Sequence, residues 1–389
     1  MDTIKSEESK MKKITIFSIN NDYGGIERYV STLCEMLYQD FEIDIVITYQ
    51  SLPISAFAFP DNVKIRYLIH EKPDDVSLKE LIKLARLIKA SKELIRRMKL
   101  KYLEIALNKN EIKNLKTDIV ITTRNFHHRL ISKFCSDDTI VKIATEHNYH
   151  QNNQTYIKEV IDSIKGFDAY VLSTQELLNF FKDKVPNVDC QLIPIALASL
   201  PEKKAGLSTK NIISIGRFSP EKAFLDLIDI VKIIVKKDKD IKLYLIGDGF
   251  QNKEIQNKIN DLDLKQYIET PGFLNPQMIE AYMLESSLYV MTSYTEAFGL
   301  VLIEAMSYGI PCIAFDSACG ARELINEEIG ILVPQRDKEK MANTIIDLLN
   351  QKELLQQYSK ALPSYIKQFT KTEIKKKWIE LINRGANAK

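Results

Sequence analysis

Two carboxylates, Glu296 and Glu304, stand out because only seven residues separate them in a mostly apolar stretch. Glu296 falls in a polar turn after the apolar strand predicted over Leu288–Met291, whereas Glu304 is the only charge in Phe298–Met306, which is typical of a buried helix. A buried carboxylate is costly unless something hydrogen-bonds it. The pair could therefore grip two parts of one extended ligand. The alternative is a core helix and a turn that each carry an incidental acid.

The start of that helix and a basic loop both suit phosphate. Phe298-Gly299-Leu300 would direct backbone N–H groups and the positive end of the helix dipole at a ligand beyond the strand. Arg217 and Lys222 share one loop after the strand predicted over 211–215. Arginine offers a planar fork and lysine a mobile point charge, which together match a diphosphate. Alone, the two cations would be ordinary surface charges.

Length and composition exclude several classes of protein. A chain of 389 residues with 45% hydrophobic and 27% charged residues suggests a globular protein of two domains. The net charge of +2 argues against nucleic acid as a general partner. The five cysteines show no metal or redox spacing, and we expect free thiols in a reducing compartment. No apolar run matches a signal peptide or a membrane span, so we expect a cytoplasmic protein, with attachment to a membrane surface left open.

The first third of the chain opens like a doubly wound α/β domain. A strand over 13–19, a turn that ends in Gly24-Gly25, a helix over 26–38 and a strand over 42–48 follow one another. A dinucleotide site is disfavoured, because the loop lacks the GxGxxG pattern and Asp44 lies early in its strand. The glycine pair instead allows the backbone to approach a ligand or a facing domain.

Further polar residues follow two later strands of this domain. Thr123-Arg124-Asn125 ends the strand over 118–122, and Glu146-His147-Asn148 ends the strand over 140–145. Ligands bind at the carboxyl ends of strands in open α/β sheets, which places His147 well for a ligand contact. A structural histidine that is hydrogen-bonded within its loop is an equal alternative.

After a linker predicted over 200–210, the same order of strands and helices starts again at residue 211. The fold class is therefore α/β, with two doubly wound, Rossmann-like domains. Within the first of them, Leu78–Leu107 reads as a long helix with nine basic and three acidic residues. Such a helix could lie on an anionic membrane surface, although a solvated helix face is the favoured interpretation.

The motifs in combination resemble the retaining GT-B glycosyltransferases of family 4 (glycosyltransferase group 1). The resemblance spans roughly residues 13 to 385 and is most specific in the C-terminal half. The motifs that carry it are Gly24-Gly25-Ile26-Glu27-Arg28, Gly216-Arg217…Lys222, Gly247-Asp248-Gly249, Glu296 and Glu304 with seven residues between them, Gly309-Ile310-Pro311, Cys319 to Ile325 and Gly330 to Val333.

The resemblance implies two domains facing a cleft. Residues 12–200 would form an acceptor-binding domain and residues 208–365 a nucleotide-sugar-binding domain, with the C-terminal helix 372–385 and Trp378 crossing back to the first. It further implies a retaining transfer of a hexose or N-acetylhexosamine to a saccharide, lipid-linked or cell-surface-polymer acceptor. A UDP-sugar is the favoured donor, and no cofactor or metal is expected.

The family pattern also implies a role for each matching residue. Arg217 and Lys222 would hold the donor diphosphate, Glu296 the donor sugar and Glu304 the ribose hydroxyls. The remaining implied contacts are made by Gly216 and Gly25 near the phosphates, by Phe298, Gly299 and Leu300 through their backbone, by Phe273 at the base, and by His147 beside the sugar.

Two small residues depart from the family pattern. Ala223 and Ala297 stand where glycine is usual, which restricts the φ angles that these loops adopt easily. Three other functions remain open. They are a UDP-GlcNAc-type epimerase on the same scaffold, a non-catalytic sugar-nucleotide-binding subunit, and an NAD oxidoreductase, which the missing fingerprint disfavours.

Overall fold

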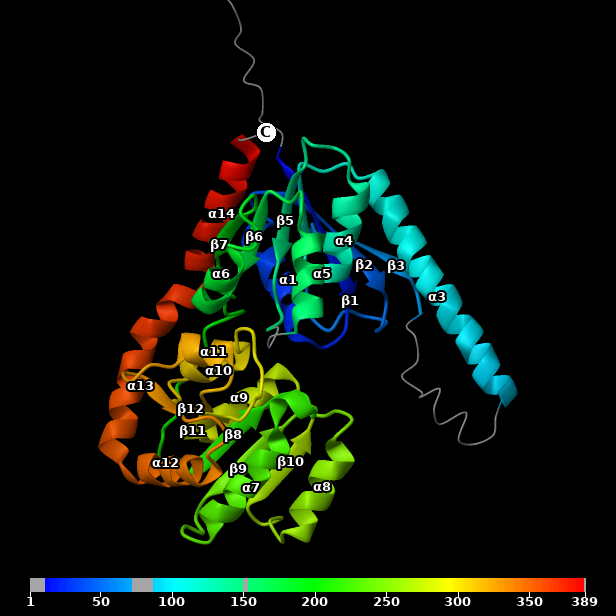
Figure 1. Cartoon of the computed structure of the whole chain (residues 1–389). Coiled ribbons are helices and arrows are strands. Elements are labelled where there is room, and N and C mark those ends of the chain that lie inside the picture. Colours follow the sequence, from blue (N-terminus) through cyan, green and yellow to red (C-terminus); the bar gives the residue numbers. More distant parts are fainter. Residues whose placement is uncertain (1–10, 72–86, 150–152, 388–389) are drawn as a thin grey trace, which may run out of the picture.

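The computed structural model describes residues 11–71, 87–149 and 153–387. Figure 1 shows two α/β halves, one above the other, each built on a parallel sheet. The N-terminal half holds a seven-stranded sheet in the order β3-β2-β1-β4-β5-β6-β7. Its strands are β1 (Lys13–Asn20), β2 (Glu42–Tyr49), β3 (Lys64–Ile69), β4 (Ile119–Thr122), β5 (Val141–Thr145), β6 (Ala169–Leu172) and β7 (Asp189–Leu192).

The C-terminal half holds a six-stranded sheet in the order β10-β9-β8-β11-β12-β13. Its strands are β8 (Asn211–Ile215), β9 (Lys242–Ile246), β10 (Ile268–Gly272), β11 (Leu288–Met291), β12 (Cys312–Phe315) and β13 (Gly330–Val333). In both sheets the order reverses beside the first strand, at β1/β4 and at β8/β11. Such switch points are where doubly wound sheets bind ligands.

The strands form because their β-branched and aliphatic residues are buried on both faces. Ile14 of β1 lies opposite Ile43 of β2 and Ile119 of β4, and all three are at most 1% exposed. Helices cover both faces of each sheet, as parallel sheets require. The helices of the N-terminal half are α1 (Gly25–Leu37), α3 (Leu87–Lys113), α4 (Asn125–Phe134), α5 (Gln154–Ser163) and α6 (Gln175–Phe181).

The second sheet is covered by a further set of helices. These are α7 (Phe224–Val235), α8 (Asn252–Asp261), α9 (Pro276–Glu285), α10 (Leu300–Ser307), α11 (Cys319–Leu324), α12 (Lys338–Asn350) and α13 (Lys352–Ile366), with the short 3₁₀ helices η1 (Pro220–Lys222) and η2 (Lys367–Phe369). Each half has its own apolar core on both sides of its sheet.

The last helix, α14 (Lys371–Asn387), returns to the N-terminal half and runs along it, red in Figure 1. Trp378 is fully buried there, in the same apolar cluster as Leu33 of α1 and Ile43 of β2. Residues 193–210, which lead from the first sheet to the second, form neither helix nor strand. The domain boundaries 12–200 and 208–365 stay predictions.

Several elements differ from the sequence-based expectation. Helix α3 continues six residues beyond Leu107 to Lys113, whereas the expected residues 78–86 lie outside the described residues. Helices α4, α5, α8 and α11 were not predicted, and α4 begins three residues after β4 ends. The helix expected from Phe298 begins at Leu300, because Gly299 has a φ of +85° and sits at its N-cap. Most other bounds agree within two residues, the usual uncertainty of helix and strand ends.

Candidate active site

The loops after β8 and β11 lie side by side because these strands pair at the switch point. The Thr292 hydroxyl, just after β11, donates to the carbonyl oxygens of Lys222 (3.1 Å) and Ala223 (3.2 Å) in the loop after β8. The same two loops carry the expected diphosphate and sugar contacts. Thr292 therefore holds them in a fixed relation to each other.

Lys222 and Glu296 face each other across these loops. Lys222 Nζ lies 2.5 Å from Glu296 Oε2, and the two side chains are 18% and 20% exposed. A partly buried pair of this kind holds both side chains in one orientation. Each charge also stays available to a ligand, since an ammonium carries three donors and a carboxylate several acceptor positions.

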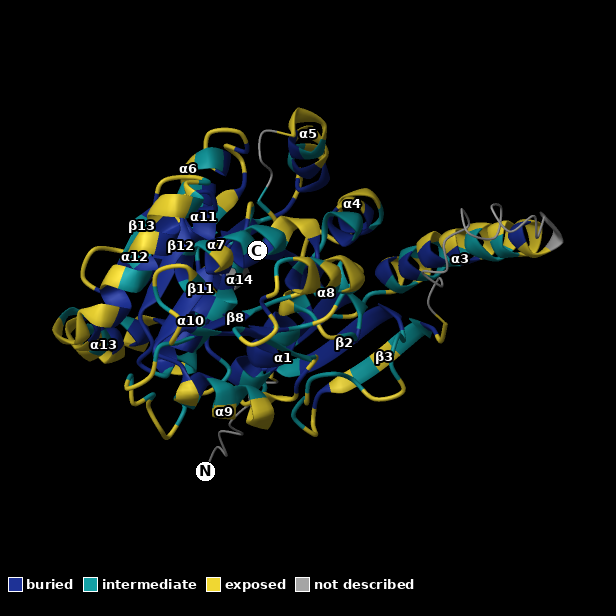
Figure 2. Cartoon of the chain, turned by 90° about the horizontal axis from the view of Figure 1, so that it is seen from below, coloured by how far each residue is buried: buried dark blue, intermediate teal, exposed yellow. Residues whose placement is uncertain are grey.

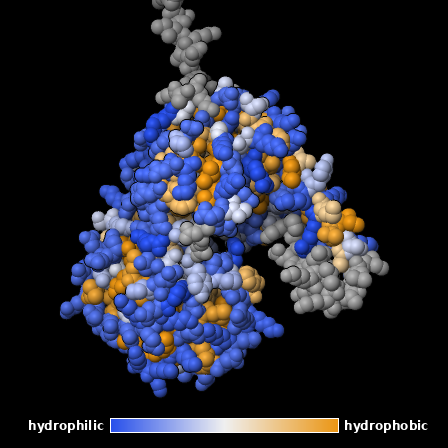
Figure 3. All heavy atoms as spheres, in the orientation of Figure 1, coloured by the Kyte–Doolittle hydropathy of each residue, from blue (hydrophilic) through white to orange (hydrophobic). Residues whose placement is uncertain are grey.

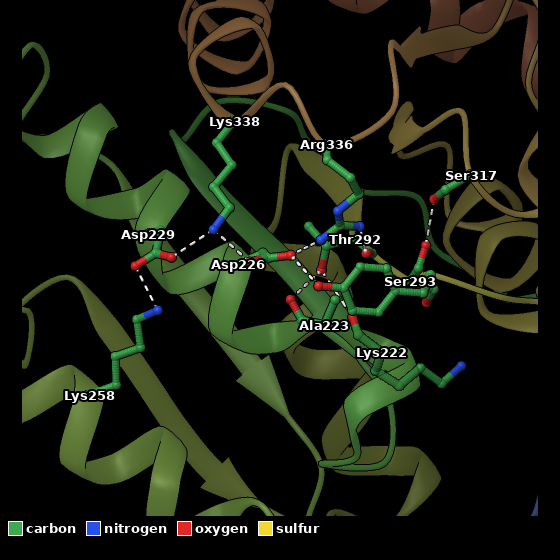
Figure 4. A network of polar contacts seen from close by, with 11 residues as sticks. Lys222, Ala223, Asp226, Asp229, Lys258, Thr292, Ser293, Ser317, Arg336 and Lys338 are labelled. Atoms are coloured by element: carbon green, nitrogen blue, oxygen red, sulfur yellow. Dashed lines mark hydrogen bonds and ion pairs between the residues drawn. The ribbon is translucent and has the colours of Figure 1, made fainter.

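A second polar network supports the loop that carries Lys222 (Figure 4). Arg336 donates to the Thr292 carbonyl oxygen (2.7 Å) and forms an ion pair with Asp226 on the first turn of α7. Its guanidinium also lies over the Tyr294 ring, 4.0 Å from the centroid. The Lys222 side chain extends away from this network in Figure 4. The network thus holds the backbone of these loops in place and leaves the Lys222 side chain outside its own contacts.

Glycines let the loops of this half come into direct contact. A Cβ on Gly247 would collide with the carbonyl oxygen of Gly216, and Gly247 has a φ of +143°. A Cβ on Gly320 would likewise collide with the Phe298 backbone, while the Gly320 N–H donates to the Glu296 carbonyl oxygen at 3.0 Å. The turn from Glu296 to Phe298 is therefore held against α11, and this close packing requires a glycine at position 320.

Glu304, on α10, meets the N-terminal half. Its carboxylate forms an ion pair with Arg28 of α1, and its side chain is 16% exposed. Burial raises the pKa of Glu304, and the Arg28 charge acts against this. Glu304, the residue expected to bind the ribose hydroxyls, thus already has a cationic partner from the opposite half.

Glu27, next to Arg28, is an acid that the sequence did not single out. It is 8% exposed, and burial raises its pKa, while its own backbone N–H and the positive charges of Arg124 and Arg217 lower it. Arg124, at the N-cap of α4, forms an ion pair with Glu27 in which its Nη2 lies 3.8 Å from Glu27 Oε1. Arg217 is itself exposed and lies close enough to act on this acid. The basic loop of one half is therefore near the glycine loop of the other.

His147, after β5, lies on the same side of the sheet. Its Nε2 is 2.8 Å from the Thr145 hydroxyl, and its ring contacts Tyr29 edge-on at 4.4 Å between centroids. Glu146 accepts hydrogen bonds from the backbone N–H groups of His147 (2.9 Å) and Asn148 (2.8 Å). Burial lowers the pKa of His147 to about 3, against the opposing charge of Glu146. His147 is thus neutral at pH 7 and can serve a sugar as a hydrogen-bonding group.

The remaining expected residues divide into two groups. Phe273 is 55% exposed, and its ring contacts Tyr23 of the N-terminal half at 4.5 Å. A Cβ on Gly25 would meet nothing within 4 Å, so the backbone there borders open space. The Phe298 ring, in contrast, is buried against Phe369, which leaves only the backbone of Phe298 for a ligand.

The structure brings together Lys222 with Glu296, and Arg28 with Glu304. It also adds Glu27, Arg336 and Asp226, which sequence reasoning missed. Glu27 and Arg28 carried a signal, because they belong to the motif that begins with the glycine pair, although no role was assigned to them. No sequence signal pointed to Arg336, because its partner Asp226 lies 110 positions away in the chain.

The described chain offers neither a metal cluster nor a membrane span. Within residues 11–71, 87–149 and 153–387, no three His, Cys, Asp or Glu side chains cluster so that they could hold a metal ion. No helix in these ranges combines the length and the apolar character that crossing a membrane requires.

Comparison with known proteins finds a family model that matches part of this chain and several similar proteins. Residues 200–364 match the family model of the glycosyl transferases group 1. An exopolysaccharide phosphotransferase of Streptomyces coelicolor is 25% identical over 95% of this chain, which spans only 40% of that relative. A Campylobacter jejuni enzyme is 24% identical over 94% of this chain and 97% of its own length. It is named N-acetylgalactosamine-N,N'-diacetylbacillosaminyl-diphospho-undecaprenol 4-alpha-N-acetylgalactosaminyltransferase.

Among solved structures, Staphylococcus aureus TarM superposes with a TM-score of 0.77 at 16% identity, covering 96% of this chain and all of that one. That structure holds a TarM point mutant in complex with fondaparinux, alpha-GlcNAc-glycerol and UDP. The similarity confirms the predicted GT-B architecture of two Rossmann-like halves.

Proposed function

We propose that this chain, whose residues 200–364 match the family model of the glycosyl transferases group 1, transfers a hexose or N-acetylhexosamine from a nucleotide sugar to a saccharide, lipid-linked or cell-surface-polymer acceptor. The observation that carries this proposal is the Lys222–Glu296 pair at the switch point of the second sheet, beside the start of α10. It combines a cation for a diphosphate with an acceptor for sugar hydroxyls. A helix N-terminus adds dipole and N–H groups that suit an anion.

In this mechanism, the bond between the sugar C1 and the β-phosphate oxygen breaks through a transition state that resembles an oxocarbenium ion. The acceptor hydroxyl oxygen then bonds to C1 on the face that the diphosphate leaves, so the configuration is retained, and its proton passes to the departing phosphate oxygen. Arg217 and Lys222 stabilise the negative charge that develops on the diphosphate, which is where electrostatic catalysis is most effective. The reaction needs no metal if these two cations meet that charge.

Glu296, His147 and Glu304 complete the donor site in this proposal. Glu296 binds the sugar hydroxyls and His147, which is neutral, lies on the opposite wall. Glu304 accepts from the ribose hydroxyls, and Phe273 borders the base. A two-carboxylate glycosidase would need both acids at the scissile bond. Here Glu296 and Glu304 face different partners, Lys222 and Arg28.

A UDP-sugar is the favoured donor, and the UDP in the TarM complex supports this choice. The name of the Campylobacter relative includes a diphospho-undecaprenol acceptor, which supports a lipid-linked saccharide and a protein that works at the inner face of a membrane. Gly25 and the first loops of the N-terminal half would then border both donor and acceptor.

A thermal-shift panel of UDP, GDP, ADP and their sugars tests the proposal directly. A ligand that binds only the folded protein raises the unfolding midpoint, and we expect the largest rise with a uridine nucleotide. If no nucleotide raises the midpoint, the donor site is wrong. Incubation of UDP-GlcNAc without acceptor distinguishes the rival epimerase, which would release a new sugar or UDP at a steady rate. A non-catalytic subunit would bind the donor and transfer nothing with any acceptor supplied.

A further inference from the structure

Helix α3 leaves the body of the N-terminal half and projects into solvent (Figures 1 and 2). Its C-terminal part is anchored, since Leu100, Glu104, Asn108 and Ile112 are all buried and recur every four residues. Leu100 packs with Tyr49 of β2 in a small apolar cluster. The anchoring face therefore occupies only one side of the helix.

A second apolar face of α3 is exposed. Leu94, Ile95, Met98, Tyr102 and Ile105 are 48%, 66%, 65%, 72% and 42% exposed. At about 100° per residue these five side chains fall within an arc of about 100°, beside the anchoring face. We call them the α3 stripe. They account for five of the large apolar side chains that are exposed in the described chain, and Figure 3 shows hydrophobic residues at the surface of this arm.

Basic residues border the α3 stripe. Lys92 and Lys99 are exposed just beyond one edge, and Lys101 is exposed at the other edge, where it pairs with Glu104 at 3.1 Å. Arg96 and Arg97 point to a further side and both hold Glu93. From Leu87 to Lys113 the helix carries eight basic and three acidic residues, a net charge of +5. An apolar stripe between cations is the pattern of a helix that lies in a membrane interface.

We propose that α3 docks the protein on an anionic lipid surface, with the α3 stripe buried at the boundary of headgroups and acyl chains and the flanking lysines on the lipid phosphates. Charge complementarity selects this occupant over a second copy of the chain, because two such helices would bring charges of +5 together. The inference deepens the proposed function, because it rests on a lipid-linked acceptor being presented at that surface.

The test is co-sedimentation of the full chain with vesicles of phosphatidylcholine alone and of phosphatidylcholine with about 30% phosphatidylglycerol. We expect binding to the anionic vesicles only, with a marked decrease when salt screens the lysines. The triple variant Ile95→Ser, Met98→Ser, Tyr102→Ser should lower the partition coefficient at least about tenfold, and Lys92→Gln with Lys99→Gln should lower it severalfold. Ile54→Ser with Phe250→Ser, at exposed apolar positions outside α3, should bind like the parent protein.

Two further measurements, of the unfolding midpoint and of its rise with UDP, make each outcome decisive. The triple variant should keep the unfolding midpoint of the parent and its rise with UDP, because the α3 stripe contacts neither core nor donor site. Failure of the UDP response in both proteins would refute the donor site and leave the vesicle result to stand by itself. The inference would be overturned if the parent protein did not bind anionic vesicles, or if the triple variant bound them as tightly as the parent does. The inference would also be overturned if the parent protein did not bind vesicles and light scattering showed it to be a dimer that the triple variant no longer forms.

Discussion

Arg28 of α1 and Glu304 of α10 form an ion pair that joins the two halves of the molecule. The pair gives the buried carboxylate a counter-charge at the position proposed to hold the ribose. A ribose that binds there must share or displace Arg28. In the proposed donor site, Glu304 would thus have two partners in turn, Arg28 from the protein and the ribose of the ligand.

Replacing Glu304→Gln should weaken UDP binding about tenfold, because a neutral amide is a poorer acceptor than a carboxylate for the ribose hydroxyls. Isothermal titration of UDP and of 2′,3′-dideoxy-UDP measures the effect. The parent protein should prefer UDP, and the variant should lose that preference while binding the dideoxy compound as before. The exposed Glu339→Gln on α12 is the control. Equal weakening for both nucleotides would place Glu304 outside the ribose site.

Replacing Lys222→Ala should lower kcat about 100- to 1000-fold, since in the proposed mechanism the cation stabilises charge that develops on the leaving diphosphate. Lys258→Ala is a matched control, because Lys258 forms a comparable ion pair with Asp229 in the same half, at 2.6 Å. Glu296→Gln should also lower kcat, and both variants should unfold like the parent in urea. Unchanged turnover of either variant with a verified donor and acceptor would contradict the roles assigned to the pair.

Arg336 should act on catalysis through the backbone of the Lys222 loop. Arg336→Ala removes the hydrogen bond to the Thr292 carbonyl oxygen, and we expect kcat/KM for the donor to fall about tenfold, with Arg336→Lys intermediate. Lys338→Ala is the matched control, since Lys338 also pairs with Asp226 (2.6 Å) but does not bond Thr292. In a Lys222→Ala background, Arg336→Ala should reduce transfer no further. A full further loss there would show a general structural effect instead.

The sequence predicts the fold well because buried parallel strands can be recognised from a short local stretch of sequence. The strand predicted over Asn211–Ile215, for example, has the same bounds in the structure. It also nominates Lys222 and Glu296, since each follows a strand in a polar turn. Their 2.5 Å contact depends on the pairing of β8 with β11, which no local pattern specifies. The Arg28–Glu304 ion pair was not predicted for the same reason, because no local sequence pattern specifies which distant residues meet. Helix α4 escaped prediction because its buried side includes the polar His127 and His128.

Ala223 offers a test of backbone strain. It has a φ of +52° and ψ of 39°, the left-handed region, where a residue with a Cβ costs about 1–2 kcal/mol relative to glycine. Ala223→Gly should therefore raise the free energy of unfolding, by about 1 kcal/mol after the extra freedom of glycine in the unfolded chain is deducted. Ala297→Gly, at a position without positive φ, should lower it. Urea denaturation compares them, and a loss of stability in Ala223→Gly would contradict the strain.

Histidines should make the fold sensitive to mild acid. Burial lowers the pKa of His127 to about 3 and that of His128 to about 4. Between these values and the ordinary pKa of about 6.5, the unfolded chain binds protons that the folded protein does not, so stability falls as the pH falls.

At about pH 5.5 the expected loss is about 1.4 kcal/mol for each of these two histidines relative to about pH 7.5. Urea unfolding at the two pH values measures it. The double variant His127→Gln, His128→Gln should be less stable than the parent at the higher pH but should lose about 3 kcal/mol less on acidification. A parent protein that is equally stable at both pH values would show that these side chains reach water or a proton acceptor in the folded state. The same acid loss in the double variant would assign the effect to other groups, His147 first among them, because burial lowers its pKa to about 3 as well.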